Sequence, residues 1–223
     1  NERFLMLFKN NTIYNNSINI LLCNTMYQGL WIRAAQKKYS VLIFSTAMRY
    51  AAQSGEAKLS KSNGSLMRSS PIGVYCHKLP LEQVAYIAGL ICGLSHPNPS
   101  VIYATQSYCI AISRLVEGDT PLCAFNITKE WLKTHEQDPG AREVLQWLNE
   151  AEEFANDAIN GKRELGVTEH LHVPYHPGSG FVRIGYYHAF KHLLLGTPIC
   201  GAIAEVIAGG GDTGAYNTGI TRD

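Results

Sequence analysis

The clearest helical signal in the chain is Pro80-Leu81-Glu82-Gln83-Val84-Ala85-Tyr86-Ile87-Ala88-Gly89-Leu90-Ile91-Cys92-Gly93-Leu94. Its apolar residues recur at i, i+3, i+4 and i+7, and they are Leu81, Val84, Ala85, Ile87, Ala88, Ile91 and Leu94. That spacing places one apolar stripe along an α-helix. The next residues are Ser95-His96-Pro97-Asn98-Pro99, and two prolines cannot continue a helix. The sequence therefore predicts a buried helix that ends before His96.

On both sides of this segment most of the chain also has a helical pattern, and convincing strand alternation is absent. The predicted helices cover 26–53, 101–116 ending at Gly118, 138–160 opened by Asp138-Pro139 and followed by Gly161, 180–195, and a last one from Thr197-Pro198 into Gly209-Gly210-Gly211. Between them we expect a polar loop over 56–70 and an irregular loop over 162–177. Residues 1–25 have no clean period and are poorly predictable. These patterns predict an all-α fold in a single domain spanning 1–223.

Composition excludes several classes of protein. Hydrophobic residues make up 46% and charged residues 17% of 223 residues, which is the balance of a globular protein. The formal net charge is +1 and Lys and Arg form no stripe, so we expect neither nucleic acid nor a membrane as a partner. No apolar run reaches the roughly 18 residues of a membrane span, and no signal peptide is evident. We therefore expect an intracellular, cytoplasmic protein.

The six cysteines are scattered and include no C-x-x-C pair; they are Cys23, Cys76, Cys92, Cys109, Cys123 and Cys200. Several lie within apolar helical patterns. Buried free thiols are therefore expected rather than disulfides or zinc ligands.

A polar segment, Ser62-Asn63-Gly64-Ser65-Leu66-Met67-Arg68, precedes the central helix and runs into the apolar residues 71–75. Asn63-Gly64 is a strong turn signal because both residues tolerate positive φ. Ser62 or Ser65 could cap a following helix, and small side chains let backbone N–H groups approach a ligand closely. The same pattern is also typical of an ordinary loop between two helices.

A second polar segment, Gly209-Gly210-Gly211-Asp212-Thr213, follows the last predicted helix. The glycines allow a sharp turn that would bring Asp212 into the interior. A short carboxylate followed by a hydroxyl suits Mg²⁺, which prefers oxygen ligands. A glycine-rich helix end with an exposed Asp212 is the alternative.

Other clusters are weaker candidates for chemistry. His188 and His192 are four residues apart on one helix face, a spacing that can hold zinc, but no third ligand is evident. His170, His172 and His176 are more typical of a polar loop beside prolines. The acidic run Glu150, Glu152 and Glu153 is more typical of a solvated helix face than of paired catalytic carboxylates.

Four ordered segments together resemble one family. Residues 62–71 resemble an N-G-x-x-M-R-x-x-P signature, and Ser95-His96-Pro97-Asn98-Pro99 is similar to an S/T-H-x-x-P turn. Residues 180–190 resemble the helix before a C-terminal metal motif, and Gly210-Gly211-Asp212-Thr213 is similar to the start of that motif, G-G-D-T-D-T. The family is that of the ADP-ribosylglycohydrolases, and the resemblance covers roughly residues 45–220.

The resemblance implies an all-α fold with a cleft that holds two Mg²⁺ ions and hydrolyses an ADP-ribose linkage on a protein side chain or a related conjugate. The residues it implies near ADP-ribose are Ser62, Asn63, Gly64, Ser65, Met67 and Arg68, with His96 near the diphosphate or the distal ribose. Asp212 and Thr213 would bind magnesium, and Asp212 is the best candidate for a catalytic carboxylate. A metal-oriented water and a carboxylate base would suit the oxocarbenium-like centre of glycoside hydrolysis.

The chain also departs from the family pattern. Gly214 and Ala215 stand where the metal motif has its second Asp and Thr, and the N-terminal T-D-D-x motif is absent. One Asp and one Thr are too few ligands for two Mg²⁺ ions. Two explanations stay open: the sequence is a fragment that lacks the family's opening segment, or the protein is an inactive member that binds ADP-ribose or a protein partner.

Overall fold

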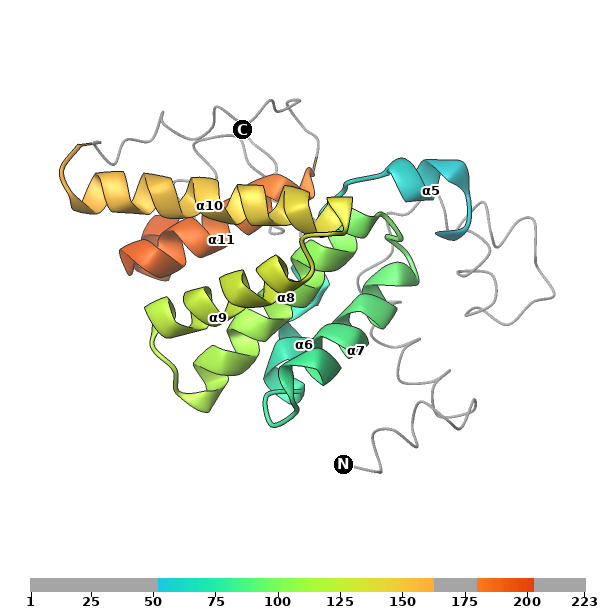
Figure 1. Ribbon diagram of the computed structural model, residues 1–223, viewed down its shortest axis with the longest axis horizontal. Helices are drawn as coiled ribbons and strands as arrows, with labels where there is room; N and C mark the ends of the chain where they lie inside the picture. The colour runs from blue at the N-terminus through green and yellow to red at the C-terminus, as the bar shows by residue number, and fades with distance from the viewer. Residues whose placement is uncertain (1–51, 163–179, 203–223) are drawn as a thin grey trace.

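The computed structural model describes residues 52–162 and 180–202, and this part of the chain is all-α, as the sequence predicts (Figure 1). Its elements, in order, are α5 (Gly55–Leu59), the 3₁₀ helix η1 (Leu66–Arg68), α6 (Ser70–Tyr75), α7 (Leu81–Gly93), α8 (Pro99–Glu117), α9 (Pro121–Thr134), α10 (Pro139–Ile159) and α11 (Val182–Leu195). The extended pairing within these residues is confined to one antiparallel bridge between Ser62 and Phe181.

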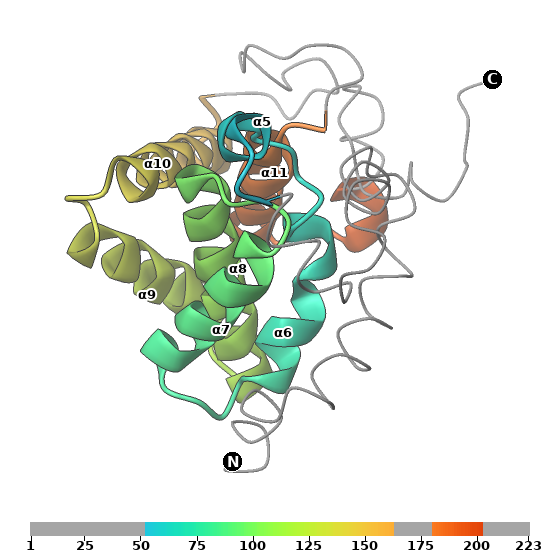
Figure 2. The ribbon, with the colours of Figure 1, turned by 90° about the vertical axis from the view of Figure 1, so that its right-hand side faces the viewer.

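Helix α8 is the centre of the fold. It contacts α6, α7, α9, α10 and α11, and Figure 2 shows these helices arranged around it. Its buried side chains include Val101, Ala104, Cys109 and Ile110, each with no exposed surface. Burying apolar surface in this way is the main favourable term in folding, at roughly 25 cal/mol per Å². The helices therefore share one core built along α8.

Short polar side chains begin three of the long helices. Asn98 accepts a hydrogen bond from the backbone N–H of Ser100 at the start of α8, Thr120 caps α9, and Asp138 caps α10. Each cap is followed by proline at the first helical position, where its missing N–H costs nothing. Gly118 ends α8 at φ 101°, a left-handed conformation that favours glycine. The sequence predictions for α7, α8, α10 and α11 are confirmed to within a few residues.

Between the predicted helices, one helix was missed and one predicted loop is wrong. Residues 121–134 form α9, for which no helix was predicted, and the polar loop expected over 56–70 contains α5, η1 and the start of α6. Helix α6 is too short for periodicity to reveal it. It packs on α8 so closely that a Cβ on Gly73 would lie 2.8 Å from Cβ of Ile112. Tertiary packing rather than local pattern therefore stabilises this helix.

Several predicted segments lie wholly or largely outside the described residues. They are the N-terminal region 1–25, the helix over 26–53 and the loop over 162–177. Of the helix expected after Pro198, residues 199–202 are helical, and the remainder lies outside the described part.

Helices α10 and α11 lie side by side (Figure 1). Ion pairs also join α10 to its neighbours. Glu150 accepts from Arg183 of α11 at 2.7 Å, and Glu152 accepts from Lys129 of α9 at 2.5 Å. Glu153 is exposed. The acidic run is a helix surface, as expected, although two of its carboxylates bridge helices rather than being wholly solvated.

The cysteine prediction is right for three of the described residues and wrong for two. Cys76, Cys92 and Cys109 are buried free thiols, whereas Cys123 and Cys200 are free but exposed. Cys123 is in the first turn of α9, the helix that was not predicted, and Cys200 lies beyond α11 in the helix expected after Pro198.

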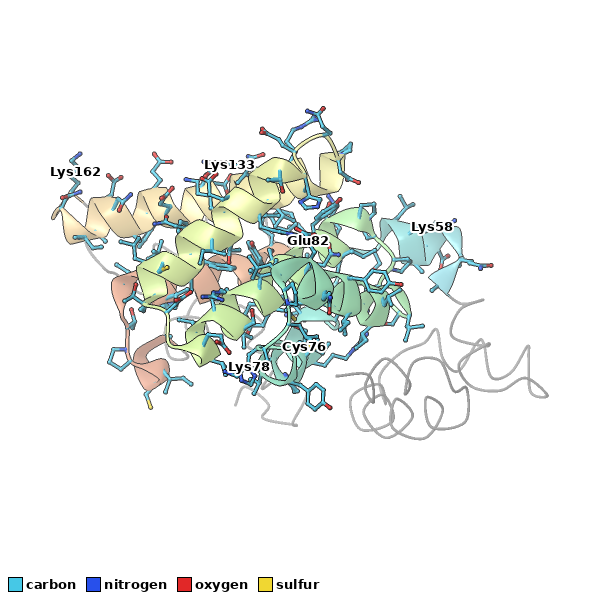
Figure 3. All side chains as sticks on the ribbon, turned by 60° about the horizontal axis from the view of Figure 1, so that its bottom comes forward. Lys58, Cys76, Lys78, Glu82, Lys133 and Lys162 are labelled. Carbon is cyan, nitrogen blue, oxygen red and sulfur yellow. The ribbon has the colours of Figure 1, made fainter. Side chains whose placement is uncertain are left out.

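The surface of the described part carries dispersed lysines. Figure 3 shows Lys58 and Lys162 at opposite ends of the described part, with Lys78 and Lys133 between them in this view. Within residues 52–162 and 180–202, no helix has both the length and the apolar character that crossing a bilayer requires.

Candidate functional site

The polar loop of residues 62–68 is anchored to the start of α11. Asn63 N–H donates to the carbonyl of Gly180 at 2.7 Å, and Val182 N–H donates to the carbonyl of Lys61 at 2.9 Å. These two bonds flank the bridge between Ser62 and Phe181. These bonds hold together two segments that are about 120 positions apart along the chain. The polar loop is therefore fixed in place by backbone hydrogen bonds.

Inside the loop the polar side chains are turned inward. Asn63 is 4% exposed, Ser65 1% and Arg68 8%. The Asn63 carbonyl accepts from Met67 N–H at 3.1 Å, which closes the turn ahead of η1. Burying a polar side chain is costly unless it finds a hydrogen-bond partner. The loop is therefore a built polar site rather than a solvated connection.

A chain of hydrogen bonds crosses the site from Arg68 to Ser62. Arg68 Nη2 donates to Ser95 Oγ in a short contact, and Ser95 Oγ lies 2.7 Å from His96 Nδ1. His96 Nε2 lies 2.9 Å from Ser62 Oγ. Arg68 Nη1 also donates to the Gly64 carbonyl at 3.4 Å. The turn after α7 and the polar loop thus form one hydrogen-bonded unit.

The electrostatics of this unit keep His96 neutral. Burial, reinforced by the positive charge of Arg68, lowers the pKa of His96 to about 4. Burial also lowers the pKa of the Arg68 guanidinium. An imidazole that does not ionise near neutral pH offers one donor and one acceptor at fixed positions.

Gly64 lies directly against the His96 ring, with an ideal Cβ at this position 3.0 Å from Nε2. That distance is below ordinary van der Waals contact, so a side chain at residue 64 would push the ring away. Glycine at this position is explained by the close approach of the loop backbone to His96.

A second set of contacts ties the loop to the starts of α8 and α10. Lys61 Nζ lies 2.6 and 2.7 Å from the two carboxylate oxygens of Glu143, and Ser100 Oγ donates to the same carboxylate. Asn98 Nδ2 donates to the Lys58 carbonyl at 2.8 Å. Because Glu143 lies 82 positions beyond Lys61, no local pattern predicted this clamp.

Beneath the loop, polar groups from α7 and α8 complete the site. Thr105 Oγ1 lies 3.5 Å from both Ser65 Oγ and Cys92 Sγ. Cys92 Sγ lies 3.4 Å from the His96 carbonyl. Burial raises the pKa of the Cys92 thiol, so this sulfur is not a thiolate nucleophile.

The structure brings together the residues that were predicted to bind ligand. Ser62, Asn63, Gly64, Ser65, Met67, Arg68 and His96 lie in the polar loop or the turn beside it. Ser62, Gly64, Met67 and His96 keep part of their surface exposed. Sequence reasoning missed Ser95, Thr105, Lys61 and Glu143; of these, Ser95 had a signal, since it precedes His96 in the quoted turn.

The predicted metal ligands Asp212 and Thr213 lie outside the described residues, as does the cluster His170, His172 and His176. Within the described ranges, no group of three or more His, Cys, Asp or Glu side chains is placed to hold a metal ion.

The zinc hypothesis for α11 gains no support from its two histidines. His188 and His192 are buried, and their rings stack with centroids 5.7 Å apart and an interplanar angle of 16°. Stacked rings on one helix face belong to the packing of that helix.

The sequence model of the ADP-ribosylglycohydrolase family matches residues 22–216. The chain belongs to this family. The match includes the polar loop, the turn at His96 and the predicted metal residues, and it extends further toward the N-terminus than the resemblance over residues 45–220. Membership of the ADP-ribosylglycohydrolase family supports the general class of hydrolase for this protein. No curated protein and no solved structure matches the chain.

Proposed function

We propose that this ADP-ribosylglycohydrolase family member binds ADP-ribose at the polar loop and removes it from modified protein side chains or related conjugates with the help of Mg²⁺. The observation that carries the proposal is the closed hydrogen-bonded unit of Arg68, Ser95, His96 and Ser62 beside Gly64. It lies where the family resemblance expects the ligand.

The chemistry of this unit suits a ligand with phosphate and ribose oxygens. Gly64 lets the loop backbone lie directly against the His96 ring, which keeps the loop and the ring together in one site. Ser62, which is partly exposed, supplies a hydroxyl group that can form a hydrogen bond with such an oxygen, while the two ring nitrogens of His96 are occupied by Ser95 and Ser62. Arg68 adds a buried positive charge close by, which favours an anionic group in the site.

In this proposal, Asp212 and Thr213 are the residues that bind Mg²⁺. The described residues do not add a ligand cluster that fits Mg²⁺, so no step is derived through the metal. Bound magnesium would orient a water and polarise ribose hydroxyls. The described residues would hold the ADP-ribose in place while water attacks the anomeric carbon of its ribose and the protein side chain leaves.

The second candidate function is binding without hydrolysis. Gly214 and Ala215 replace the second Asp and Thr of the metal motif, while the polar loop is intact and ordered. A chain with this combination would retain ADP-ribose binding and lose turnover, acting as a module that recognises ADP-ribose or an ADP-ribosylated protein.

The two functions are separated by a hydrolysis assay on ADP-ribosylated protein, followed by mass spectrometry of the modified peptides. The hydrolase predicts loss of the ADP-ribose mass in magnesium buffer and no loss with EDTA. The binding module predicts retention of the modification in both buffers, together with capture of the modified protein by the wild-type chain. If the modification is retained and the modified protein is not captured, both functions are contradicted. Asp212→Asn is the matched variant, and the hydrolase predicts that it abolishes turnover.

A further inference from the structure

The direction of each hydrogen bond between Arg68 and Ser62 can be assigned. A guanidinium has donors and no acceptor, so Ser95 Oγ accepts from Arg68 Nη2. A hydroxyl whose oxygen accepts from a cation becomes a better donor through its own hydrogen, because hydrogen bonds in a chain polarise one another. Ser95 therefore donates its hydrogen to His96 Nδ1, 2.7 Å away.

The state of His96 follows from this assignment. When Nδ1 of a neutral imidazole accepts a hydrogen bond, the ring proton resides on Nε2. Nε2–H then donates to Ser62 Oγ at 2.9 Å. The Ser62 hydroxyl hydrogen takes no part in this bond and is free to point elsewhere.

The opposite tautomer fits the contacts less well. Nδ1–H would also have to donate to Ser95 Oγ, which already accepts from Arg68. The Ser95 hydrogen would then need another acceptor, and Ser95 Oγ has no further hydrogen bond among the described residues. Nε2 would become an acceptor and take the Ser62 hydrogen away from the ligand side.

We propose that Arg68 and Ser95 are positioning residues that hold His96 as the neutral Nε2–H tautomer, so that Ser62 presents its hydroxyl hydrogen to an acceptor oxygen of the ligand. The tautomer is a property of the free protein, whereas the ligand oxygen rests on the proposed function. The site then selects for an oxygen that accepts hydrogen bonds, such as a phosphate or ether oxygen, and against a group that can only donate.

The tautomer is tested by long-range ¹H–¹⁵N correlation spectra of the full chain, which distinguish a protonated from an unprotonated ring nitrogen. The chain has eight histidines. The ring signals that disappear from the spectrum of the His96→Gln variant are therefore those of His96. The expected wild-type pattern is Nε2–H with Nδ1 unprotonated. Ser95→Ala should give a mixture of tautomers, and Ser95→Thr, which keeps the hydroxyl, should restore the wild-type pattern.

The matched control is Ser113→Ala, in which a buried serine of α8 loses a hydroxyl that bonds only its own helix at 2.7 Å. It should leave the His96 signals unchanged, although it can lower the stability. A wild-type pattern of Nδ1–H, or an unchanged pattern in Ser95→Ala, would overturn the proposal. Should Ser95→Ala fail to fold, the wild-type pattern alone decides.

Titration with ADP-ribose tests the role of the Ser62 hydrogen. Ser95→Ala should weaken binding about threefold to tenfold, since one well-placed hydrogen bond is at stake, and Ser95→Thr should bind as the wild type does. Equal affinity of Ser95→Ala and the wild type would overturn this role. A wild type with the expected tautomer and no affinity for ADP-ribose would instead overturn the proposed function, and the two failures are therefore distinguishable.

Discussion

The backbone of Gly64 lies so close to the His96 ring that a Cβ would be 3.0 Å from Nε2 and 3.1 Å from Cε1. A side chain at residue 64 would push the ring by a few tenths of an ångström and so strain its bonds to Ser62 and Ser95. This contact links the loop that we assign to ADP-ribose with the turn that follows α7.

Gly64→Ala should therefore weaken ADP-ribose binding by roughly tenfold or more, since it disrupts at least one hydrogen bond at the ring. Calorimetric titration measures the change. Gly93→Ala is the matched control, because no described atom lies within 4 Å of a Cβ at Gly93. Unaltered affinity in Gly64→Ala would show that the ligand does not depend on the position of His96.

The crossing of α8 and α10 depends on a second close contact. A Cβ on Gly140 would lie 2.7 Å from Cβ and 2.8 Å from the carbonyl carbon of Pro99, and 2.9 Å from N of Ser100. Backbone atoms cannot swing aside as a long side chain can. We expect Gly140→Ala to lower the free energy of unfolding by about 1–3 kcal/mol, as overpacking typically does.

Urea denaturation measures that loss, with Gly55→Ala as its control. No described atom lies within 4 Å of a Cβ at Gly55, which begins α5, so alanine there should leave stability unchanged or raise it by up to about 1 kcal/mol. Equal stability of the two variants would contradict the close packing of α10 on α8.

Thiol reactivity should separate the described cysteines into two groups. Burial raises the pKa of Cys76 to about 11 and that of Cys109 to about 12, whereas Cys123 and Cys200 are exposed. Because the thiolate is the reactive form, iodoacetamide at neutral pH should label Cys123 and Cys200 quickly, and Cys76 and Cys109 only after unfolding. Peptide mapping by mass spectrometry gives the order. Rapid labelling of Cys109 in the native chain would contradict the packing of α8.

His96 should make stability depend on acid pH. Its pKa falls from 6.5 to about 4 on folding, through burial and the neighbouring Arg68, while its other contacts, Ser62, Ser95 and Cys92, carry no charge. The unfolded chain thus binds the proton more readily, so this contribution is fully present above about pH 6.5 and is lost as the pH falls toward 4. The slope is at most about 1.4 kcal/mol per pH unit for one proton.

The pH effect is measured as the difference between the wild type and His96→Gln in urea denaturation at pH 7, 6 and 5. The glutamine variant lacks the titrating group, so its free energy of unfolding should fall less over this range. Parallel curves for the two proteins would mean that His96 ionises equally well in the folded and unfolded chain.

The sequence predicted the helices whose boundaries and faces are encoded locally. The apolar spacing of α7, the proline after Asp138 and the glycine after α8 are strong local signals, and the structure agrees with them. Helix α9 carried a comparable signal in Thr120-Pro121 and was overlooked. Helix α6 carried little signal, since its stability comes from the contact of Gly73 with α8.

The candidate site was predictable as a set of residues and not as a network. Turn chemistry and the family resemblance indicated the loop and His96. The bridge from Lys61 to Glu143 and the bonds that join Arg68 to Ser62 through Ser95 connect segments that are distant along the chain. Their partners are chosen by the packing of whole helices, which no local pattern contains.

The most direct test of the central claim is calorimetric titration of the full chain with ADP-ribose, with and without Mg²⁺, for the wild type and Ser62→Ala. We expect saturable binding by the wild type, weaker binding by Ser62→Ala in both buffers, and stronger binding by the wild type in magnesium. Absence of binding by the wild type, or binding that is indifferent to Ser62, would contradict the assignment of the polar loop to ADP-ribose.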